Sequence, residues 1–207
     1  MLSYKNFIII ISSPSGVGKT SIIDEIRRRD NNIKFSVSAT TRSPRANEVN
    51  GKNYYFLDSG AFLKKIDNDE FVEHASVFGN HYGTLKSEIT KRFNEGYDVI
   101  MDVDWQGNRQ ISSKIDRNEL LRIFLLPPDM ETMKNRIRKR NLDDKVVIDR
   151  RIAEAKSEIE HFDEYDYVVI NDDFEKSVSE VSALISAKRI GNVSNDELRR
   201  FVNGLRS

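Results

Sequence analysis

The chain has 207 residues, 32% of them charged, and its 33 basic and 33 acidic side chains cancel to a formal net charge of zero. This length suits one domain, or one core with inserted lobes, and the neutral total argues against binding to nucleic acid through a global positive field. The absence of cysteine excludes disulfides, thiolate metal sites and a thiol nucleophile, and without a signal-like N-terminus or a long apolar span we expect a cytoplasmic protein that does not bind membranes.

The first predicted element is a buried strand over residues 7–11, followed by a glycine-bearing turn and a helix with isoleucines on one face. This order is typical of a P-loop, in which backbone N–H groups converge on phosphate oxygens. Lys19 would reach the outer phosphates, and the Thr20 hydroxyl would hold Mg²⁺. An ordinary strand-to-helix turn is the alternative, and Ser13 stands where the strict pattern has glycine. The predicted cradle is Ser13-Pro14-Ser15-Gly16-Val17-Gly18-Lys19-Thr20.

An arginine-bearing loop follows a short extended segment at residues 33–37. Arg42 and Arg45 flank Pro44 among hydroxyl side chains, and because arginine forks match phosphate bidentately, the loop is a candidate anion site. A solvated polar loop remains the alternative. Asn50-Gly51 before the apolar segment 54–57 indicates a hairpin.

Residues 59–84 read as a short helix followed by a mixture of aromatic residues, glycine and polar groups, as in the wall of a pocket. His74 and His81 lie in this stretch. Without a matching carboxylate–histidine spacing, surface or hydrogen-bonded histidines are favoured over a metal pair.

A second buried strand, over residues 99–104, ends in carboxylates after a helix that runs from about Leu85 to Gly96. Since side chains alternate along a strand, Asp102 and Asp104 are expected on one face. An acid at the carboxyl end of a parallel strand beside a P-loop can orient hydrated Mg²⁺. The alternative is an exposed acidic turn.

The segment 120–126 predicts a further strand, and two helices joined by a polar tip at 141–144 follow it. Arg136 and Arg140 are four residues apart on the first helix and should project from one face. Arg151 lies on the second helix. A solvated charged surface is the usual alternative for so basic a run.

The last predicted strand covers 167–170 and is followed by a helix that bears Val178, Val181, Leu184 and Ile185. Beyond it, Leu198, Phe201, Val202 and Leu205 have the spacing of a short amphipathic helix, expected to pack on the body or on a partner.

Several motifs in fixed order resemble the guanylate kinase family: the P-loop, the 38–45 loop, Glu48-Val49-Asn50-Gly51, Tyr82-Gly83, the segment 102–107 and Val169-Ile170-Asn171-Asp172. The resemblance covers about residues 7–188. It implies an α/β fold of the P-loop NTPase type, with three layers around a parallel β-sheet. The core would comprise residues 1–35, 86–128 and 152–190, with a GMP-binding lobe at about 36–85, a helical lid at about 129–151 and a helical tail at about 191–207.

The resemblance also implies an activity, in which MgATP phosphorylates GMP, and dGMP as well, to the diphosphate. Carried over by motif, the catalytic residues would be Lys19, Arg42, Arg136, Arg140 and Arg151. ATP would contact residues 13–20 and Asn171, and Mg²⁺ would contact Thr20 and Asp102. The residues on GMP would be Arg42, Arg45, Tyr54 and Tyr82 at its phosphate and Ser38, Glu73, Thr84 and Asp104 at guanine.

Two other functions are compatible with parts of this pattern. The same fold occurs as a phosphopeptide-binding module in scaffold proteins, but such modules have degraded P-loops, and this chain keeps Lys19 and the lid arginines. A P-loop phosphotransferase with another acceptor is disfavoured by the guanine-facing set. Departures from the family pattern at Ser13, Asn47 and Asn141 remove no group that the reaction needs, and the pattern leaves open whether the protein is a monomer or a homo-oligomer.

Overall fold

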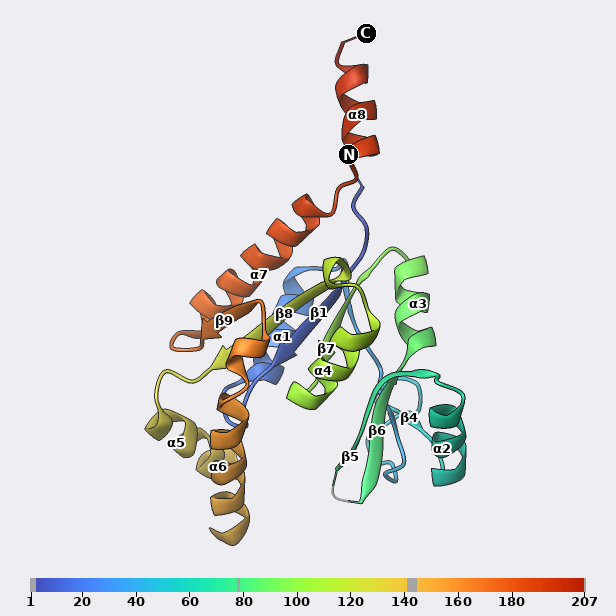
Figure 1. The fold of residues 1–207 in the computed structure, drawn as a ribbon. Helices are drawn as coiled ribbons and strands as arrows, with labels where there is room; N and C mark the ends of the chain where they lie inside the picture. The colour runs from blue at the N-terminus through green and yellow to red at the C-terminus, as the bar shows by residue number, and fades with distance from the viewer. Residues whose placement is uncertain (1–2, 78, 141–144, 207) are drawn as a thin grey trace.

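The computed structural model describes residues 3–77, 79–140 and 145–206, except for the side chains at 139–140 and 145–147. The described chain forms a central sheet covered by helices, a small lobe with its own sheet, and an arm of two helices (Figure 1). No described helix is long and apolar enough to cross a membrane.

The central sheet is parallel throughout, in the order β2-β7-β1-β8-β9. Ile11 of β1 is in register with Asp102 of β7, so the loop after β1 and the end of β7 lie at the same edge. This edge is where ligands gather in open parallel sheets. The strands are β1 (Ile8–Ser12), β2 (Ile33–Phe35), β7 (Asp98–Asp102), β8 (Leu120–Leu126) and β9 (Tyr167–Ile170).

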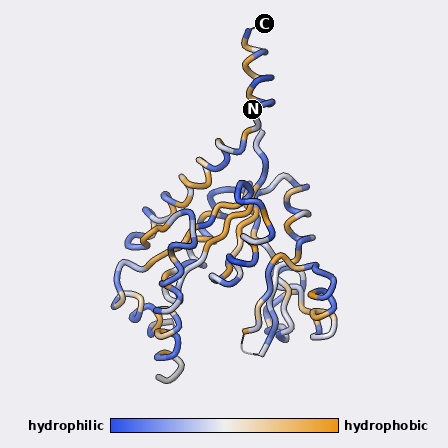
Figure 2. Tube along the Cα trace, viewed as in Figure 1, coloured by the Kyte–Doolittle hydropathy of each residue, from blue (hydrophilic) through white to orange (hydrophobic). Residues whose placement is uncertain are grey.

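The strand β1 is buried along its whole length, as expected for a central parallel strand with helices on both faces. Ile9 and Ile11 pack with α1 (Lys19–Arg29) and α7 (Phe174–Gly191), whereas Ile8 and Ile10 pack with α3 (Lys86–Asn94) and α4 (Trp105–Lys114). Burying each isoleucine side chain stabilises the folded state by roughly 1.5–3 kcal/mol relative to leaving it exposed. Figure 2 shows hydrophobic residues along the central strands and many hydrophilic residues along the surrounding helices. The expected three-layer α/β fold is confirmed.

The lobe, residues 36–85, contains a second sheet in the order β4-β3-β6-β5. Its own small core contains Ala39, Phe62 and Phe71, all buried. The expected hairpin at Asn50-Gly51 is wrong, because β4 pairs with β3, and in parallel orientation. Gly51 does form a tight turn with Tyr54, but residues 41–49 before it are a loop. The elements are β3 (Ala39–Thr40), β4 (Tyr55–Phe56), α2 (Ser59–Asp67), β5 (Phe71–Val77) and β6 (Asn80–Leu85).

The arm consists of α5 (Met130–Arg140) and α6 (Lys145–Ile159). Met133, Ile137 and Ala155 form its core and are almost completely buried between the two helices. The polar tip expected at 141–144 lies outside the described residues. The arm therefore has a small apolar core of its own, apart from the two cores of the central sheet.

The strand β7 ends at Asp102, and Asp104 is the N-cap of α4. The Asp104 carboxylate accepts a hydrogen bond from the Gly107 backbone N–H at 2.9 Å. The expectation that Asp102 and Asp104 share one face of a strand is therefore wrong. Aspartate satisfies the free N–H groups of a helix start, which favours a cap over a longer strand.

The tail forms the expected amphipathic helix α8 (Asn195–Gly204), which points away from the sheet (Figure 1). Its apolar residues Leu198, Phe201, Val202 and Leu205 are exposed. The Glu197 carboxylate accepts hydrogen bonds from Ser3 at 2.6–2.8 Å, which joins α8 to the N-terminal segment. Two short 3₁₀ turns, η1 (Arg117–Glu119) and η2 (Phe162–Glu164), precede β8 and β9.

Candidate active site

The loop between β1 and α1 has the geometry of a phosphate cradle. Gly16 and Gly18 have φ angles of +84° and +104°, which strongly favour glycine. A Cβ at Gly16 would lie 2.7 Å from Ile137 Cγ1, so glycine also lets the arm approach closely. At Ser13, where the strict pattern has glycine, the backbone φ is not left-handed, so serine fits this position without strain. The start of α1 has no side-chain cap, which leaves its N–H groups to a ligand.

Two side chains from distant parts of the chain hold this loop through the same carbonyl. Asn171 Nδ2 donates to Val17 O at 2.7 Å, and Arg136 Nη1 donates to it at 3.1 Å. Asn171 follows β9, whereas Arg136 comes from α5 of the arm. The P-loop is therefore hydrogen-bonded directly to the arm.

Lys19 lies at the first position of α1 and contacts Asp102 at the end of β7, with 2.5 Å between Nζ and Oδ1. The two side chains are 19% and 30% exposed, so both remain accessible to a ligand. The structure thus brings together the predicted phosphate-binding lysine and the predicted metal-binding carboxylate.

A buried carboxylate lies where the lobe meets the sheet. Glu73 on β5 is 7% exposed, and its Oε1 accepts a hydrogen bond from the Thr84 hydroxyl at 2.7 Å. Burial raises the pKa of Glu73, and the nearby Asp104 carboxylate raises it further. A Cβ at Gly107 would lie 3.4 Å from Glu73 Oε2, so α4 approaches closely. The group is a strong acceptor for a ligand that brings N–H donors.

The arginine-bearing loop folds back on an acid. Arg42 Nη2 lies 2.7 Å from Glu48 Oε1, and the Arg45 backbone N–H donates to Glu48 Oε2 at 2.7 Å. The Arg42 hydrogen bond is the main reason that the pKa of Glu48 is lowered. The Arg42 guanidinium lies 5.5 Å from the Tyr54 ring, which packs edge-on against Tyr82 at 6.1 Å. The candidate anion site is therefore built around Arg42.

The remaining predicted residues are less closely assembled. Arg45 is exposed, Ser38 is half-buried beside β3, and Arg151 is half-buried on α6. The side chain of Arg140 lies outside what the structure describes.

Two acids at this site have roles that the sequence did not indicate. Glu48 holds the loop that carries Arg42 and Arg45, but its spacing from Arg42 follows no helix or strand period that would have indicated a contact. Glu158 on α6 lies among Lys19, Asp104 and the Ser15 backbone, and burial raises its pKa. Its position at the P-loop depends on how the arm folds back, which no local pattern shows.

Comparisons with known proteins agree on one family. A profile of the guanylate kinase family matches residues 5–188. Guanylate kinase of Alkalilimnicola ehrlichii is 43% identical over 88% of this chain and 89% of its own length, and that of Rickettsia prowazekii is 42% identical over 93% and 97%.

The fold supports the same assignment. The crystal structure of guanylate kinase from Anaplasma phagocytophilum superposes with a TM-score of 0.71 at 34% identity, covering 91% of this chain and 89% of that one. A P-loop on a parallel sheet, a small-sheet lobe with a buried carboxylate, and matches over nearly the full length lead to one conclusion. The chain belongs to the guanylate kinase family.

Proposed function

We infer that this protein transfers the γ-phosphoryl group of ATP to GMP, giving ADP and GDP. The observation that carries this function beyond the family match is the buried Glu73 carboxylate with its Thr84 hydroxyl partner. Guanine presents adjacent N1–H and N2–H₂ donors, which such a carboxylate can accept together. Asp104 and Ser38 complete the proposed base site, and dGMP offers the same base.

The lobe at 36–85 is then the GMP-binding lobe, and the arm contributes the lid. Arg42, Arg45, Tyr54 and Tyr82 bind the GMP phosphate, and Lys19, Arg136, Arg140 and Arg151 surround the phosphates of ATP. Phosphoryl transfer needs positioning and neutralisation of charge more than covalent help from the protein. A closed arm also excludes water, which would otherwise accept the phosphoryl group.

The residues beside Lys19 fit a magnesium ion. The Thr20 hydroxyl and the Asp102 carboxylate are hard oxygen donors, and Asp102 is accessible at the edge of the sheet. The described residues hold no cluster of three or more His, Cys, Asp or Glu side chains that could bind a metal. Mg²⁺ is commonly bound by one or two protein groups together with substrate phosphates, so the oxygen atoms of Thr20 and Asp102 would suffice. When bound there, the ion would offset charge on the phosphate oxygens.

The test is ADP formation with MgATP and each of GMP, dGMP, AMP, CMP and UMP. We expect kcat/KM for GMP to exceed that for AMP by up to about 10⁴-fold, because a base that lacks the matching donors leaves buried acceptors unpaired. Glu73→Gln should narrow this ratio mainly by impairing GMP. Comparable use of AMP would contradict the guanine site, and no ADP release with any monophosphate would contradict the kinase.

A further inference from the structure

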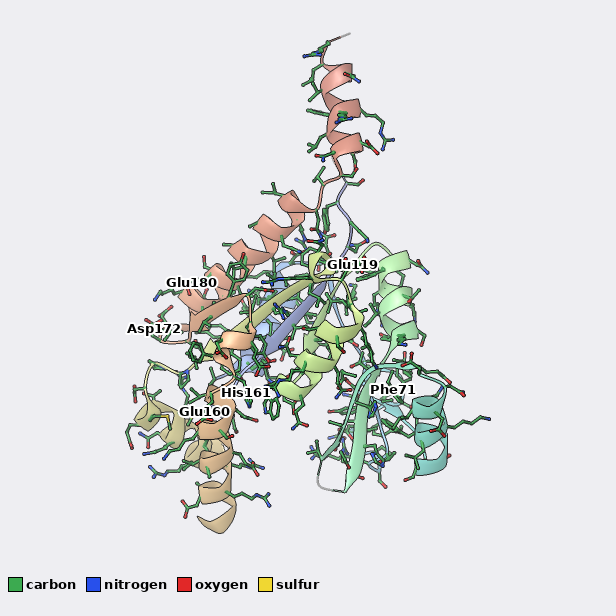
Figure 3. The ribbon with its side chains drawn as sticks, viewed as in Figure 1. Phe71, Glu119, Glu160, His161, Asp172 and Glu180 are labelled. Atoms are coloured by element: carbon green, nitrogen blue, oxygen red, sulfur yellow. The ribbon has the colours of Figure 1, made fainter. Side chains whose placement is uncertain are left out.

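Four side chains outside the proposed substrate contacts join the arm to the central body. The ring of His161, two residues after α6, stacks on the indole of Trp105, the first residue of α4, with centroids 3.9 Å apart and planes 15° apart. The Arg109 guanidinium lies 4.6 Å from the Trp105 ring. Figure 3 shows His161 where α6 reaches α4.

Glu164 contacts both Arg109 and His161. Its carboxylate accepts two hydrogen bonds from Arg109, at 2.8 and 2.6 Å, and its Oε1 lies 2.7 Å from His161 Nδ1. A bidentate arginine–carboxylate pair holds its geometry better than a single contact does. His161 is only 19% exposed, so the stack is shielded from solvent. We call these four residues, Trp105, Arg109, His161 and Glu164, the clamp.

The position of the clamp gives it a consequence for the site. Trp105 directly follows Asp104, which caps α4 and lies beside Glu73 in the proposed guanine site. His161 lies two residues beyond α6, the helix that carries Arg151 and Glu158. The clamp therefore ties the first turn of α4, on the guanine side, to the C-terminal end of the arm, on the ATP side.

We propose that Trp105 and His161 are positioning residues that fix the pivot of the arm on α4 and thereby couple ATP binding to GMP binding. This inference rests on the proposed function. A ligand that moves the arm must rotate it about its attached ends, and a firm contact at one end transmits that rotation to Asp104. Without the stack, the arm closes on ATP while α4 stays unaffected.

The test measures coupling. Calorimetry gives the Kd of GMP with and without the Mg²⁺ complex of the β,γ-imido analogue of ATP. For the unmodified protein we expect the analogue to tighten GMP binding by about 5- to 10-fold, within the usual range for linked sites. In His161→Ala the ratio should fall to within about 2-fold of one, with the Kd of GMP alone unchanged within about 2-fold. His161→Phe keeps a ring on Trp105 and should restore most of the coupling.

A second pair of variants controls for the loss of a surface arginine. Arg109→Gln removes the bond to Glu164 and should weaken the coupling. Arg117→Gln removes a different ion pair, in which Arg117 Nη2 lies 3.1 Å from Asp166 Oδ1, and this variant should leave the coupling intact because the pair lies outside the arm. Trp105 is the single tryptophan of the chain, so its emission reports on the stack. We expect the analogue to change that emission in the unmodified protein and in His161→Phe, but not in His161→Ala.

Two results would overturn the inference: full coupling in His161→Ala, or no coupling in the unmodified protein. Each of these two coupling results is compatible with normal phosphorylation of GMP, so neither would contradict the proposed function. Failure of the proposed function would appear separately, as no ADP formation by the unmodified protein.

Discussion

At the scale of single residues, Lys19 should be essential for turnover and dispensable for folding. It contacts the outer phosphates in the proposed site, and its partner Asp102 is accessible enough to be hydrated when the lysine is lost. Lys19→Ala should therefore lower kcat by about 10²–10³-fold, the usual loss for one preorganised charge partner, with the circular dichroism spectrum unchanged. Steady-state ADP release measures the effect.

The matched control is Lys86→Ala, which removes another lysine–aspartate pair, at 2.6 Å from Asp69. It should leave turnover intact. Near-native turnover in Lys19→Ala would remove the P-loop from the mechanism.

The buried Glu73 carboxylate should lower the stability of the substrate-free protein at neutral pH. Its pKa in the folded protein is raised above the ordinary value of 4.5, mainly by burial. Folding thus favours the protonated form of Glu73. The free energy of unfolding gains the full contribution of this group below about pH 4.5 and loses it as the pH rises through the folded-state pKa. At pH 7 the buried charge destabilises the substrate-free protein, and Glu73→Gln removes that charge while it can still accept from Thr84.

Thermal unfolding without nucleotide measures this effect. We expect Glu73→Gln to raise Tm by a few degrees at pH 7, since 1 kcal/mol corresponds to roughly 2–4 °C for a chain of this size. The difference should shrink as the pH approaches 4.5. A lower Tm for the variant at pH 7 would show that the carboxylate stabilises the fold instead.

The residues that the sequence identified are those whose neighbours along the chain carry the signal. Lys19 follows two glycines in a strand-to-helix turn, and Arg42 and Arg45 flank a proline. No neighbouring residue indicated the contacts of Glu48 with its own loop, and the contacts of Glu158 form only when the tertiary fold brings α6 to the P-loop.

At the scale of elements, α5 meets the P-loop through Arg136, whose Nη1 donates to Val17 O at 3.1 Å. In the proposed function the arm brings this guanidinium to the phosphates on closing, so its loss should affect the reacting state more than the binding of GMP. Arg136→Ala should lower kcat by about 10²-fold or more and leave the Kd of GMP within about 2-fold. Initial rates at saturation and calorimetry separate the two quantities.

Arg138→Ala on the same helix is the control, because that side chain is 53% exposed and pairs only loosely with Glu131, at 3.7 Å. If Arg136→Ala instead weakened GMP binding and left saturated turnover unchanged, the arm would not be a lid.

Elements were predictable where burial is continuous or the period is clear. Both β8 and β9 have the predicted bounds, since each is a run of apolar residues stopped by polar residues or proline. The pairing of β4 was not predictable from its turn, because a turn shows that the chain reverses but not which strand it joins. Likewise, the end of β7 depends on Asp104 capping the next helix.

At the scale of the whole molecule, an ionic cluster closes the sheet at the edge opposite the site. Asp98 at the start of β7 is fully buried and accepts hydrogen bonds from Arg189 Nε at 2.8 Å and from the Tyr4 hydroxyl at 3.1 Å. Arg189 also contacts Asp30 at 2.5 Å. The cluster thus joins the N-terminal segment, the end of α1, β7 and the end of α7.

Asp98→Asn should destabilise the protein by about 3–5 kcal/mol, because it leaves part of a buried positive charge unpaired. Urea unfolding measures the loss, and kcat of the folded protein should not change, since the cluster lies far from the P-loop along the strands. Asp69→Asn, an exposed aspartate with lysine partners, should have little effect. Equal stability of Asp98→Asn and the unmodified protein would show that hydration replaces the pair.

The lobe and the arm each leave the central sheet and return to it. The lobe departs after β2 and comes back at α3, and the arm departs after β8 and comes back before β9. A body attached at two points keeps one easy motion, a swing about the line that joins them. Four short stretches of backbone carry these attachments, and side-chain contacts reinforce them: Gln110 of α4 hydrogen-bonds to the backbone of His74 in the lobe, and Arg136 of the arm donates to Val17 O. Changes of length in those stretches should therefore be tolerated far less than changes at the outer tips of either part.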